Sequence, residues 1–270
     1  KNDDDFLKEE FAVRKRNGFV VEFLNSRDIK SKFGFSASAA ILSKEGAQTN
    51  AYLLTHALHQ HGISKGLRVF DRSYIGQVKH HKNGIVLKTE TGYTIKARKL
   101  VYATGYEVVK HIRKKVVKLH STYAAVSQHI ETEMPSWKDD TMMWSTASPY
   151  LYMRAVKGNR IMVGGRDEPF FNPRRRDRLL TKKAKQLGLD FRKLFPKVPF
   201  DAEFSWTGTF GVTEDGLPFI GEYPELPNSF FSLGFGGNGI TFSWIAAEII
   251  SGLVLGKRNP DAAIFSFSRI

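Results

Sequence analysis

The sequence contains no cysteine. This absence excludes disulfide bonds and thiolate metal sites, and it fits the cytoplasmic location that we expect. No apolar run approaches the ~18 residues that a membrane-spanning helix needs, and no signal-peptide pattern is visible. The eight histidines do not have the spacing of metal ligands. We therefore expect neither a metal site nor a membrane span.

The composition instead supports a folded protein with a substantial core. The 270 residues are enough for one large domain or two modest ones, and 41% of them are hydrophobic. Strands alternate with helices in some segments, whereas several alternating strands follow one another after Val116. This mixture predicts a fold of the α/β (α+β) class with two interleaved domains.

Local patterns predict individual elements. A helix is expected from Asn50 to His61 with Gly62 as its C-cap, followed by a three-stranded meander over residues 69–97. Residues 100–103 predict a buried parallel strand, and residues 174–189 a single amphipathic helix. His80 and His81 lie beside a predicted hairpin turn, where we expect them to be exposed to solvent.

A formal net charge of +14 makes the chain strongly basic. The cations concentrate in two segments, which contain Lys110, Arg113, Lys114, Lys115 and Lys118, and Arg174, Arg175, Arg176, Arg178, Lys182, Lys183 and Lys185. Such runs are usually solvated helix faces or connectors. The alternative is attraction to nucleic acid or acidic lipid. We favour the solvated face, because no nucleic-acid-binding motif accompanies the charge.

The most informative segment is a glycine-rich turn between a predicted strand and an apolar helix. It reads Phe235-Gly236-Gly237-Asn238-Gly239-Ile240-Thr241. Glycine lets a ligand approach the backbone without interference from a Cβ atom, and a helix start offers free N–H groups at the positive end of its dipole. The turn is therefore a candidate site for a phosphate, a carboxylate or an electron-rich ring. Its alternative role is a tight connection between strand and helix.

Further segments accompany this turn. They are Trp206-Thr207-Gly208, Thr213-Glu214-Asp215-Gly216-Leu217-Pro218-Phe219-Ile220-Gly221, Lys99-Leu100-Val101-Tyr102-Ala103-Thr104-Gly105-Tyr106, and Asp261 followed by Phe265-Ser266-Phe267-Ser268-Arg269. Together with the glycine turn they resemble the signature of the D-amino-acid-oxidase-like FAD-dependent oxidoreductases. The resemblance covers nearly the whole chain, and it says little about the substrate.

The resemblance implies a partial Rossmann-like FAD-binding domain interleaved with an antiparallel-sheet substrate domain. We expect residues 1–45 and 116–208 in the substrate domain, and residues 46–115 and 209–270 in the FAD-binding domain. The family's G-x-G-x-x-G after a first strand is absent from this sequence. We interpret the chain as a fragment that lacks the N-terminal βαβ unit and expect it to be inactive alone. The alternative is an intact protein that resembles only the rest of the family.

The resemblance assigns FAD contacts to three turns. Backbone groups of the glycine turn would contact the flavin, through Gly236, Gly237, Asn238, Gly239, Ile240 and Thr241. Ala103, Thr104 and Gly105 would approach the cofactor by their backbone. Asp215 would lie in a turn beside the flavin. Alternatives are a purely structural turn for Asp215 and an N-cap role for Thr241.

Substrate contacts are expected on one strand. Tyr150, Tyr152 and Arg154 alternate and so face one side, where they would bind a substrate carboxylate. The alternative is an exposed sheet face, and Arg166 is a lesser candidate. Amino-acid-oxidising relatives often place an arginine just beyond the W-x-G. Thr209 and Phe210 occupy that stretch here, which puts simple α-amino acids in doubt unless Arg154 replaces that arginine.

The function that the resemblance implies is oxidation of an amine or amino-acid C–N bond with FAD as the cofactor. The partner is then a small-molecule amine or amino acid, and no catalytic base can be identified. Two alternatives remain open, namely a flavin enzyme that modifies a tRNA base and a flavin-free binding module. The electron acceptor and the oligomeric state are not indicated.

Overall fold

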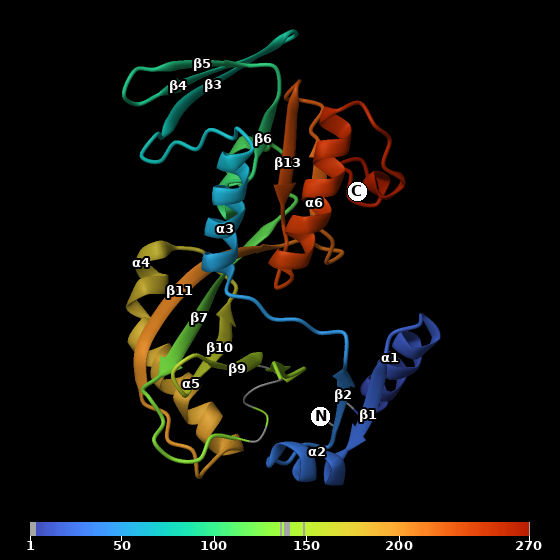
Figure 1. Cartoon of the computed structure of the whole chain (residues 1–270), viewed down its shortest axis with the longest axis vertical. Coiled ribbons are helices and arrows are strands. Elements are labelled where there is room, and N and C mark those ends of the chain that lie inside the picture. Colours follow the sequence, from blue (N-terminus) through green and yellow to red (C-terminus); the bar gives the residue numbers. More distant parts are fainter. Residues whose placement is uncertain (1–3, 136, 138–140, 148, 270) are drawn as a thin grey trace. The chain divides into compact units, whose positions relative to one another are not determined.

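The computed structural model describes residues 4–135, 137, 141–147 and 149–269. The chain divides into two compact units (Figure 1). Unit 1 comprises Lys1–Gln48 and Ser121–Gly208, and unit 2 comprises Thr49–His120 and Thr209–Ile270. The boundaries predicted from the sequence were 45/46, 115/116 and 208/209. The mixture of helices with antiparallel and parallel strands confirms the α/β (α+β) class.

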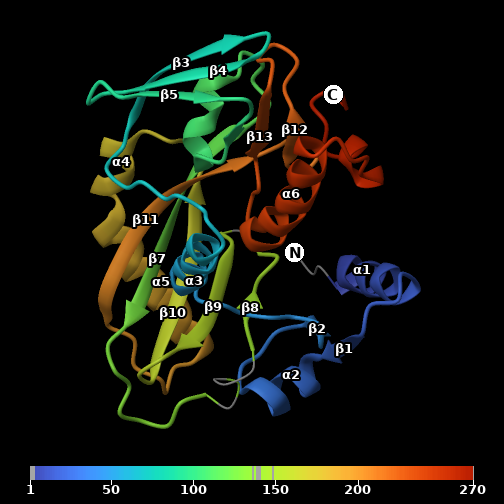
Figure 2. The same cartoon turned by 45° about the horizontal axis from the view of Figure 1, so that its top comes forward.

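Unit 1 is built on a five-stranded sheet of order β11-β7-β10-β9-β8. Its strands are β7 (Lys118–Ser127), β8 (Met143–Trp144), β9 (Leu151–Val156), β10 (Arg160–Glu168) and β11 (Ala202–Val212). The pairs β7–β10, β9–β10 and β8–β9 are antiparallel. One face carries the helices α4 (Pro173–Arg178) and α5 (Leu180–Leu194), as both views show (Figures 1 and 2).

The core of unit 1 lies between α5 and the sheet. Apolar residues alternate along the strands, and Leu187 and Phe191 of α5 pack against Met153 and Val163. The prediction of one helix over residues 174–189 is wrong at Leu179. Its N–H bonds to the carbonyl of Arg176, three residues back, which breaks the regular α-helical series between α4 and α5.

The first elements of unit 1 form a small helix–hairpin assembly. They are α1 (Asp4–Arg16), β1 (Val21–Asn25), α2 (Ser26–Phe33) and β2 (Ala39–Ser43). Strands β1 and β2 pair antiparallel. Asn25 caps α2, because its side chain accepts hydrogen bonds from the N–H groups of Arg27 and Asp28.

Unit 2 contains a three-stranded sheet of order β12-β13-β6. Its elements are β6 (Leu100–Tyr102), a 3-10 helix over Gly105–His111, β12 (Phe219–Glu222), β13 (Ser229–Leu233), α6 (Gly239–Val254) and a 3-10 helix over Pro260–Ala263. Strand β6 runs parallel to β13, as predicted. Its expected burial is wrong at Val101, which is 44% exposed, because β6 is the end strand of this sheet among the described residues.

The predicted three-stranded meander of unit 2 is confirmed as β3 (Ile75–His81), β4 (Gly84–Thr89) and β5 (Thr94–Ala97), but the first strand begins at Ile75 and residues 69–74 form no strand. His81 is exposed as expected, but His80 is half-buried. The His80 Nδ1 atom lies 3.1 Å from the Ser229 hydroxyl, and its Nε2 atom lies 3.3 Å from the Tyr102 hydroxyl. His80 therefore ties the meander to the sheet of unit 2.

Helix α3 (Ala51–Ser64) opens unit 2 with Asn50 as its N-cap. None of its residues is buried, and Tyr52 and Leu58 are 71% and 58% exposed. The prediction that Gly62 ends the helix is wrong, because the cap is Lys65. The glycine with the left-handed backbone of a helix end is Gly66, with φ +95°.

Candidate functional site

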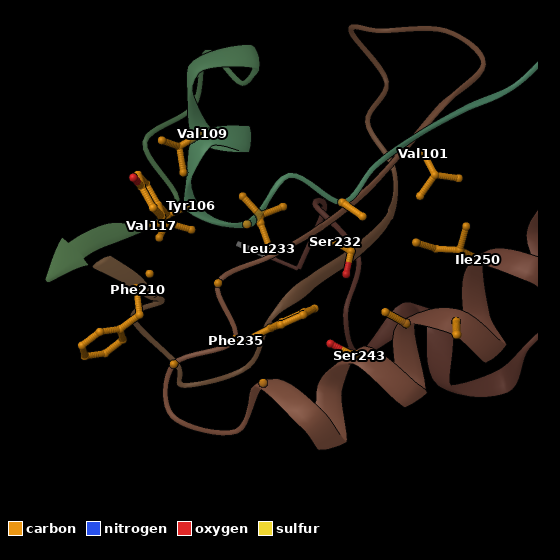
Figure 3. Close-up of a pocket in the computed structure, with 18 of the residues that line it drawn as sticks. Val101, Tyr106, Val109, Val117, Phe210, Ser232, Leu233, Phe235, Ser243 and Ile250 are labelled. Atoms are coloured by element: carbon orange, nitrogen blue, oxygen red, sulfur yellow. The ribbon is translucent and has the colours of Figure 1, made fainter. Parts of the chain in front are cut away.

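A cavity of about 780 Å³ lies within unit 2 (Figure 3). The two turns that the sequence singled out meet around it. Ala103 and Gly105 contribute from the turn after β6, and Gly236 and Gly239 from the turn after β13. The structure thus brings together two segments more than a hundred residues apart at one hollow.

The glycine turn is held by backbone hydrogen bonds and leaves space on its outer side. The Gly236 N–H donates to the carbonyl of Gly211 at 2.9 Å. Gly236 has φ +54°, a conformation that favours glycine. A Cβ atom added at Gly236, Gly237 or Gly239 would meet no protein atom within 4 Å. These positions therefore have the open approach that a planar ligand requires.

Helix α6 begins directly at this turn. Its N-cap is Asn238, whose side chain makes no capping hydrogen bond. The prediction that Thr241 serves as N-cap is wrong, because Thr241 lies in the first turn of the helix. The N–H groups of the first helical turn of α6 lack intrahelical acceptors and lie at the positive end of the helix dipole. The site therefore suits a ligand edge that carries negative charge, as reduced flavin does.

The turn after β6 is also open. Gly105 has φ +59°, and no protein atom lies within 4 Å of a Cβ atom placed there. Thr104 is exposed and occupies the N-cap position of the 3-10 helix without a side-chain capping bond. Ala103 and Gly105 line the cavity with little side chain. Open backbone in both turns fits the flavin that the resemblance implies.

Asp215 does not line the cavity and instead forms an ion pair with Arg269. Its carboxylate accepts two hydrogen bonds from Arg269, at 2.7 and 3.1 Å, and one from the Leu217 N–H at 3.1 Å. The hydrogen bonds from Arg269 lower the pKa of Asp215 to about 2. Arg269 also bonds to the carbonyls of Leu217 and Pro218. These contacts support the interpretation of Asp215 as a turn residue.

Part of the cavity wall was not identified from the sequence. Ser232 of β13 lines it, and α6 contributes one face, which comprises Gly239, Ser243, Ala246, Ala247, Ile250, Ser251 and Val254 (Figure 3). The spacing of these mostly small residues follows the helical repeat. That spacing was the signal that could have predicted the wall.

In unit 1, the structure places Tyr152 and Arg154 on the sheet face away from α5. They alternate along β9 with Leu151 and Met153, which lie in the core under α5. Tyr150 lies just before the strand, and its ring centroid is 5.9 Å from that of Tyr152. Tyr150 is 42% exposed, whereas Tyr152 and Arg154 are half-buried. This face is therefore more enclosed than a solvated sheet surface.

Electrostatics favour the neutral form of both tyrosines. Burial raises the pKa of Tyr150 and of Tyr152, and the negative charge of Asp167 raises each pKa further. Both hydroxyls therefore remain protonated at neutral pH and can donate hydrogen bonds. Arg154 approaches the Gln48 side chain, with Nη1 3.5 Å from Oε1.

Arg166 is occupied by an ion pair on the other side of the sheet. It donates hydrogen bonds of 2.5 and 2.9 Å to Asp190 of α5, and these hydrogen bonds raise the pKa of Arg166. A β-bulge between Gly165 and Glu168 interrupts the register of β10 with β7, so alternation along β10 from Gly164 does not decide the face on which Arg166 lies. The lesser candidacy of Arg166 as a substrate ligand has no structural support.

The basic segments are mainly exposed. In α4 and α5 the exposed cations are Arg174, Arg175, Arg178, Lys182 and Lys185, whereas Lys183 is buried and bonds to Glu168. Lys110, Arg113, Lys114, Lys115 and Lys118 are exposed in unit 2. Over the described residues no cluster of His, Asp and Glu side chains could hold a metal ion. No helix in the described ranges is long and apolar enough to span a membrane.

Comparison with known proteins adds independent evidence. The family described as DAO, FAD dependent oxidoreductase, matches residues 1–253. Glycine oxidase from Geobacillus kaustophilus (strain HTA426) is 28% identical over 238 residues, which cover 86% of this chain and 60% of that protein. The chain therefore spans about three fifths of the length of this relative.

Solved structures show the same fold. The crystal structure of glycine oxidase from Geobacillus kaustophilus superposes with a TM-score of 0.83 at 23% identity, covering 100% of this chain and 72% of that chain. L-proline dehydrogenase from P. horikoshii gives a TM-score of 0.79 at 18% identity, covering 96% and 71%. With the family match over nearly all of the sequence, the chain belongs to the DAO family of FAD-dependent oxidoreductases.

Proposed function

We propose that the protein carrying this chain oxidises the C–N bond of a small amine or amino acid. The observation that supports this most is the cavity of unit 2, where two open glycine turns meet at the start of α6. The chemistry that FAD supplies when bound is acceptance of a hydride from the carbon next to nitrogen, which leaves an imine that water hydrolyses. The similarity to glycine oxidase supports an amino-acid-like substrate.

The chain's own residues would hold and orient the flavin. Open backbone at Gly236, Gly237 and Gly239 admits the ring edge, and the first turn of α6 stabilises negative charge on it. Ala103 and Gly105 would form the opposite wall. Thr104, Asn238, Ile240 and Thr241 remain proposed contacts.

Tyr150, Tyr152 and Arg154 would bind the substrate carboxylate. A guanidinium and two protonated phenols are donors, and a carboxylate accepts from all of them. We assign no general base. A substrate amine that enters unprotonated needs none for hydride transfer.

The test is anaerobic reduction of the purified flavoprotein, expressed from its complete reading frame. Glycine, N-methylglycine, L-proline and D-alanine are added separately, and the flavin absorbance is followed. Bleaching by at least one compound, with release of the corresponding carbonyl product, is expected. An intact yellow protein that none of them reduces would contradict the proposal. A colourless protein would favour the flavin-free binding module.

We also propose that these 270 residues alone bind FAD weakly and are inactive. The supporting observation is that no G-x-G-x-x-G follows a strand near the start of this sequence, where the family's pyrophosphate-binding βαβ unit has its glycine cradle. Titration of the 270-residue chain with FAD, followed by flavin fluorescence, tests this. A stoichiometric yellow complex that survives gel filtration would overturn it.

The exposed cations of α4 and α5 favour a second candidate, modification of a tRNA base. In that case tRNA binding would weaken steeply with salt, because phosphate contacts release counterions. A gel-shift assay with tRNA at two salt concentrations tests this candidate. Absence of a shift at low salt would remove this candidate.

A further inference from the structure

Tyr152 lies over a glycine of the neighbouring strand. In the register of β9 and β10, Tyr152 is opposite Gly164. A Cβ atom at Gly164 would lie 2.2 Å from Cζ, 2.3 Å from Oη and 2.5 Å from Cε2 of Tyr152. The tyrosine ring thus occupies the space that any side chain at residue 164 would need.

The ring reaches across β10 to the strand beyond it. Against the burial that raises the pKa of Tyr152, Thr122 acts as a hydrogen-bond partner that lowers this pKa, and Thr122 belongs to β7, on the other side of β10. A tyrosine can bridge from the first strand to the third only if the residue between them has no side chain. The hydrogen bond and the flat packing together fix both ends of the ring.

Gly164 and Gly165 are both restricted to glycine, but for different structural reasons. Gly165 has φ +128°, and a Cβ atom there would lie 2.1 Å from the carbonyl oxygen of Tyr150. Gly164 has no such backbone requirement, because its φ is not in the left-handed region. Residue 164 is therefore constrained by its contact with Tyr152 and not by conformation.

We propose that Gly164 is a positioning residue for substrate binding, because it lets the Tyr152 ring lie flat across β10 with its hydroxyl held at Thr122. This inference rests on the proposed function, in which Tyr152 binds the substrate carboxylate. A side chain at residue 164 lifts the ring from the sheet, which both releases the hydroxyl and fills space needed by a substrate. The competing role is sheet stability alone, since an aromatic ring over a glycine also supports strand pairing.

The experiment compares Gly164→Ala, Tyr152→Phe and Tyr152→Ala in the flavoprotein, with Gly46→Ala as the matched control. Gly46 also belongs to unit 1, its φ is not positive, and a Cβ atom there would meet no protein atom within 4 Å. Carbon-13 labelling of the tyrosine Cζ atoms reports the ring, and the resonance missing from Tyr152→Phe identifies Tyr152. Steady-state kinetics with glycine as the probe report substrate binding.

We expect Gly164→Ala to shift the Tyr152 resonance. KM for glycine should rise about tenfold, the size of one lost hydrogen bond, with a smaller change in kcat. In the Tyr152→Ala background the same Gly164→Ala change should have no further effect on KM. Gly46→Ala should match the wild type in both measurements.

Three results would overturn the inference. They are an unchanged Tyr152 resonance in Gly164→Ala, a shifted resonance with unchanged KM, and full additivity of the two substitutions. If the wild-type protein oxidises none of the amines tested, the proposed function fails and the substrate role of Gly164 fails with it. The resonance then still reports whether Gly164 seats the ring, so the two failures can be told apart.

Discussion

The two units use their helices differently. In unit 1, α5 buries Ala184, Leu187 and Phe191 against the sheet, and its exposed charged residues are Lys182, Lys185, Arg192 and Lys193. In unit 2, α3 has no Asp, Glu, Lys or Arg and yet buries none of its residues. Uncharged helices with several leucines are normally covered by protein on their apolar side, yet Leu53 and Leu58 of α3 are 56% and 58% exposed. In unit 1 the helix α5 thus covers the main core, whereas the described part of unit 2 leaves apolar surface on α3 and on Val101 of β6.

The largest expected effect concerns the glycine turn of unit 2. Gly237→Val should abolish flavin binding and leave the thermal unfolding transition nearly unchanged. Valine at residue 237 meets no backbone strain, because the positive φ in this turn belongs to Gly236. A Cβ atom at Gly237 would meet no protein atom within 4 Å, so a valine there should leave the fold intact and block the flavin that we propose at this turn.

The measurements for Gly237→Val are flavin content by absorbance and the melting temperature. Gly46→Val is the matched control, because Gly46 of unit 1 is also open and has no positive φ. Full flavin occupancy and normal turnover in Gly237→Val would show that the turn is only a connection.

A second prediction compares the helices directly. Phe191→Ala in α5 should lower the free energy of unfolding by about 3–5 kcal/mol, because it leaves a cavity in the core of unit 1. Leu58→Ala in α3 should change it by less than about 0.5 kcal/mol, because the side chain is 58% exposed. Urea denaturation of the 270-residue chain measures both. A large loss in Leu58→Ala would mean that α3 is covered in solution and would break the comparison.

A smaller effect is expected at the Tyr face of unit 1. Arg154→Ala should weaken substrate binding by about 1.5–3 kcal/mol, the value of one charge-assisted hydrogen bond. Steady-state kinetics of the flavoprotein with glycine measure this as a rise in KM. Arg192→Ala, an exposed cation of α5, is the control for charge. Kinetics of Arg154→Ala that match the wild type would remove Arg154 from the site.

The smallest effect is the pH dependence of the Asp215–Arg269 pair. Because the pKa of folded Asp215 is lowered to about 2 from 3.8, the pair contributes stability above pH ~4 and loses it as the pH falls towards 2. Asp215 is 36% exposed on its side chain, so solvent screening keeps the contribution below about 1 kcal/mol.

Asp215→Asn should therefore flatten part of the acid limb of the stability curve between pH 4 and 2. Thermal melts across this range measure the slope. Glu214→Gln changes the charge of the adjacent residue and should not reproduce the effect. Equal slopes in the wild type and in Asp215→Asn would contradict the assignment of this pair.

The sequence predicted the elements whose local signals agree with their tertiary setting. The strand before Gly236, the turn and α6 all carried their own signature, and so did the parallel strand before Ala103. The features that the sequence did not predict depend on contacts between residues that are far apart in the sequence. Local patterns gave no sign of the ion pair between Arg166 and Asp190 of α5, or of the ion pair between Asp215 and Arg269.

Burial was the least predictable property. The sequence of α3 predicts a helix correctly, but its coverage depends on what else packs there and not on its own residues. The same holds for Val101, whose exposure follows from the position of β6 at the end of the sheet. In contrast, Tyr152 and Arg154 were placed correctly on one face, because strand alternation alone decides it over a short interval.

The Asp215–Arg269 contact also determines how the second half of unit 2 can unfold. It joins residues 54 positions apart, and the closed loop between them contains β12, β13, the glycine turn and α6. Unfolding that starts on the C-terminal side should have to break the hydrogen bonds of Arg269 before α6 can separate from β12 and β13. The loop should therefore open as one cooperative segment, and amide exchange at the start of α6 should follow that of β13. Arg269 should therefore slow the unfolding of the glycine turn that is proposed to bind flavin, although Arg269 is not part of that turn.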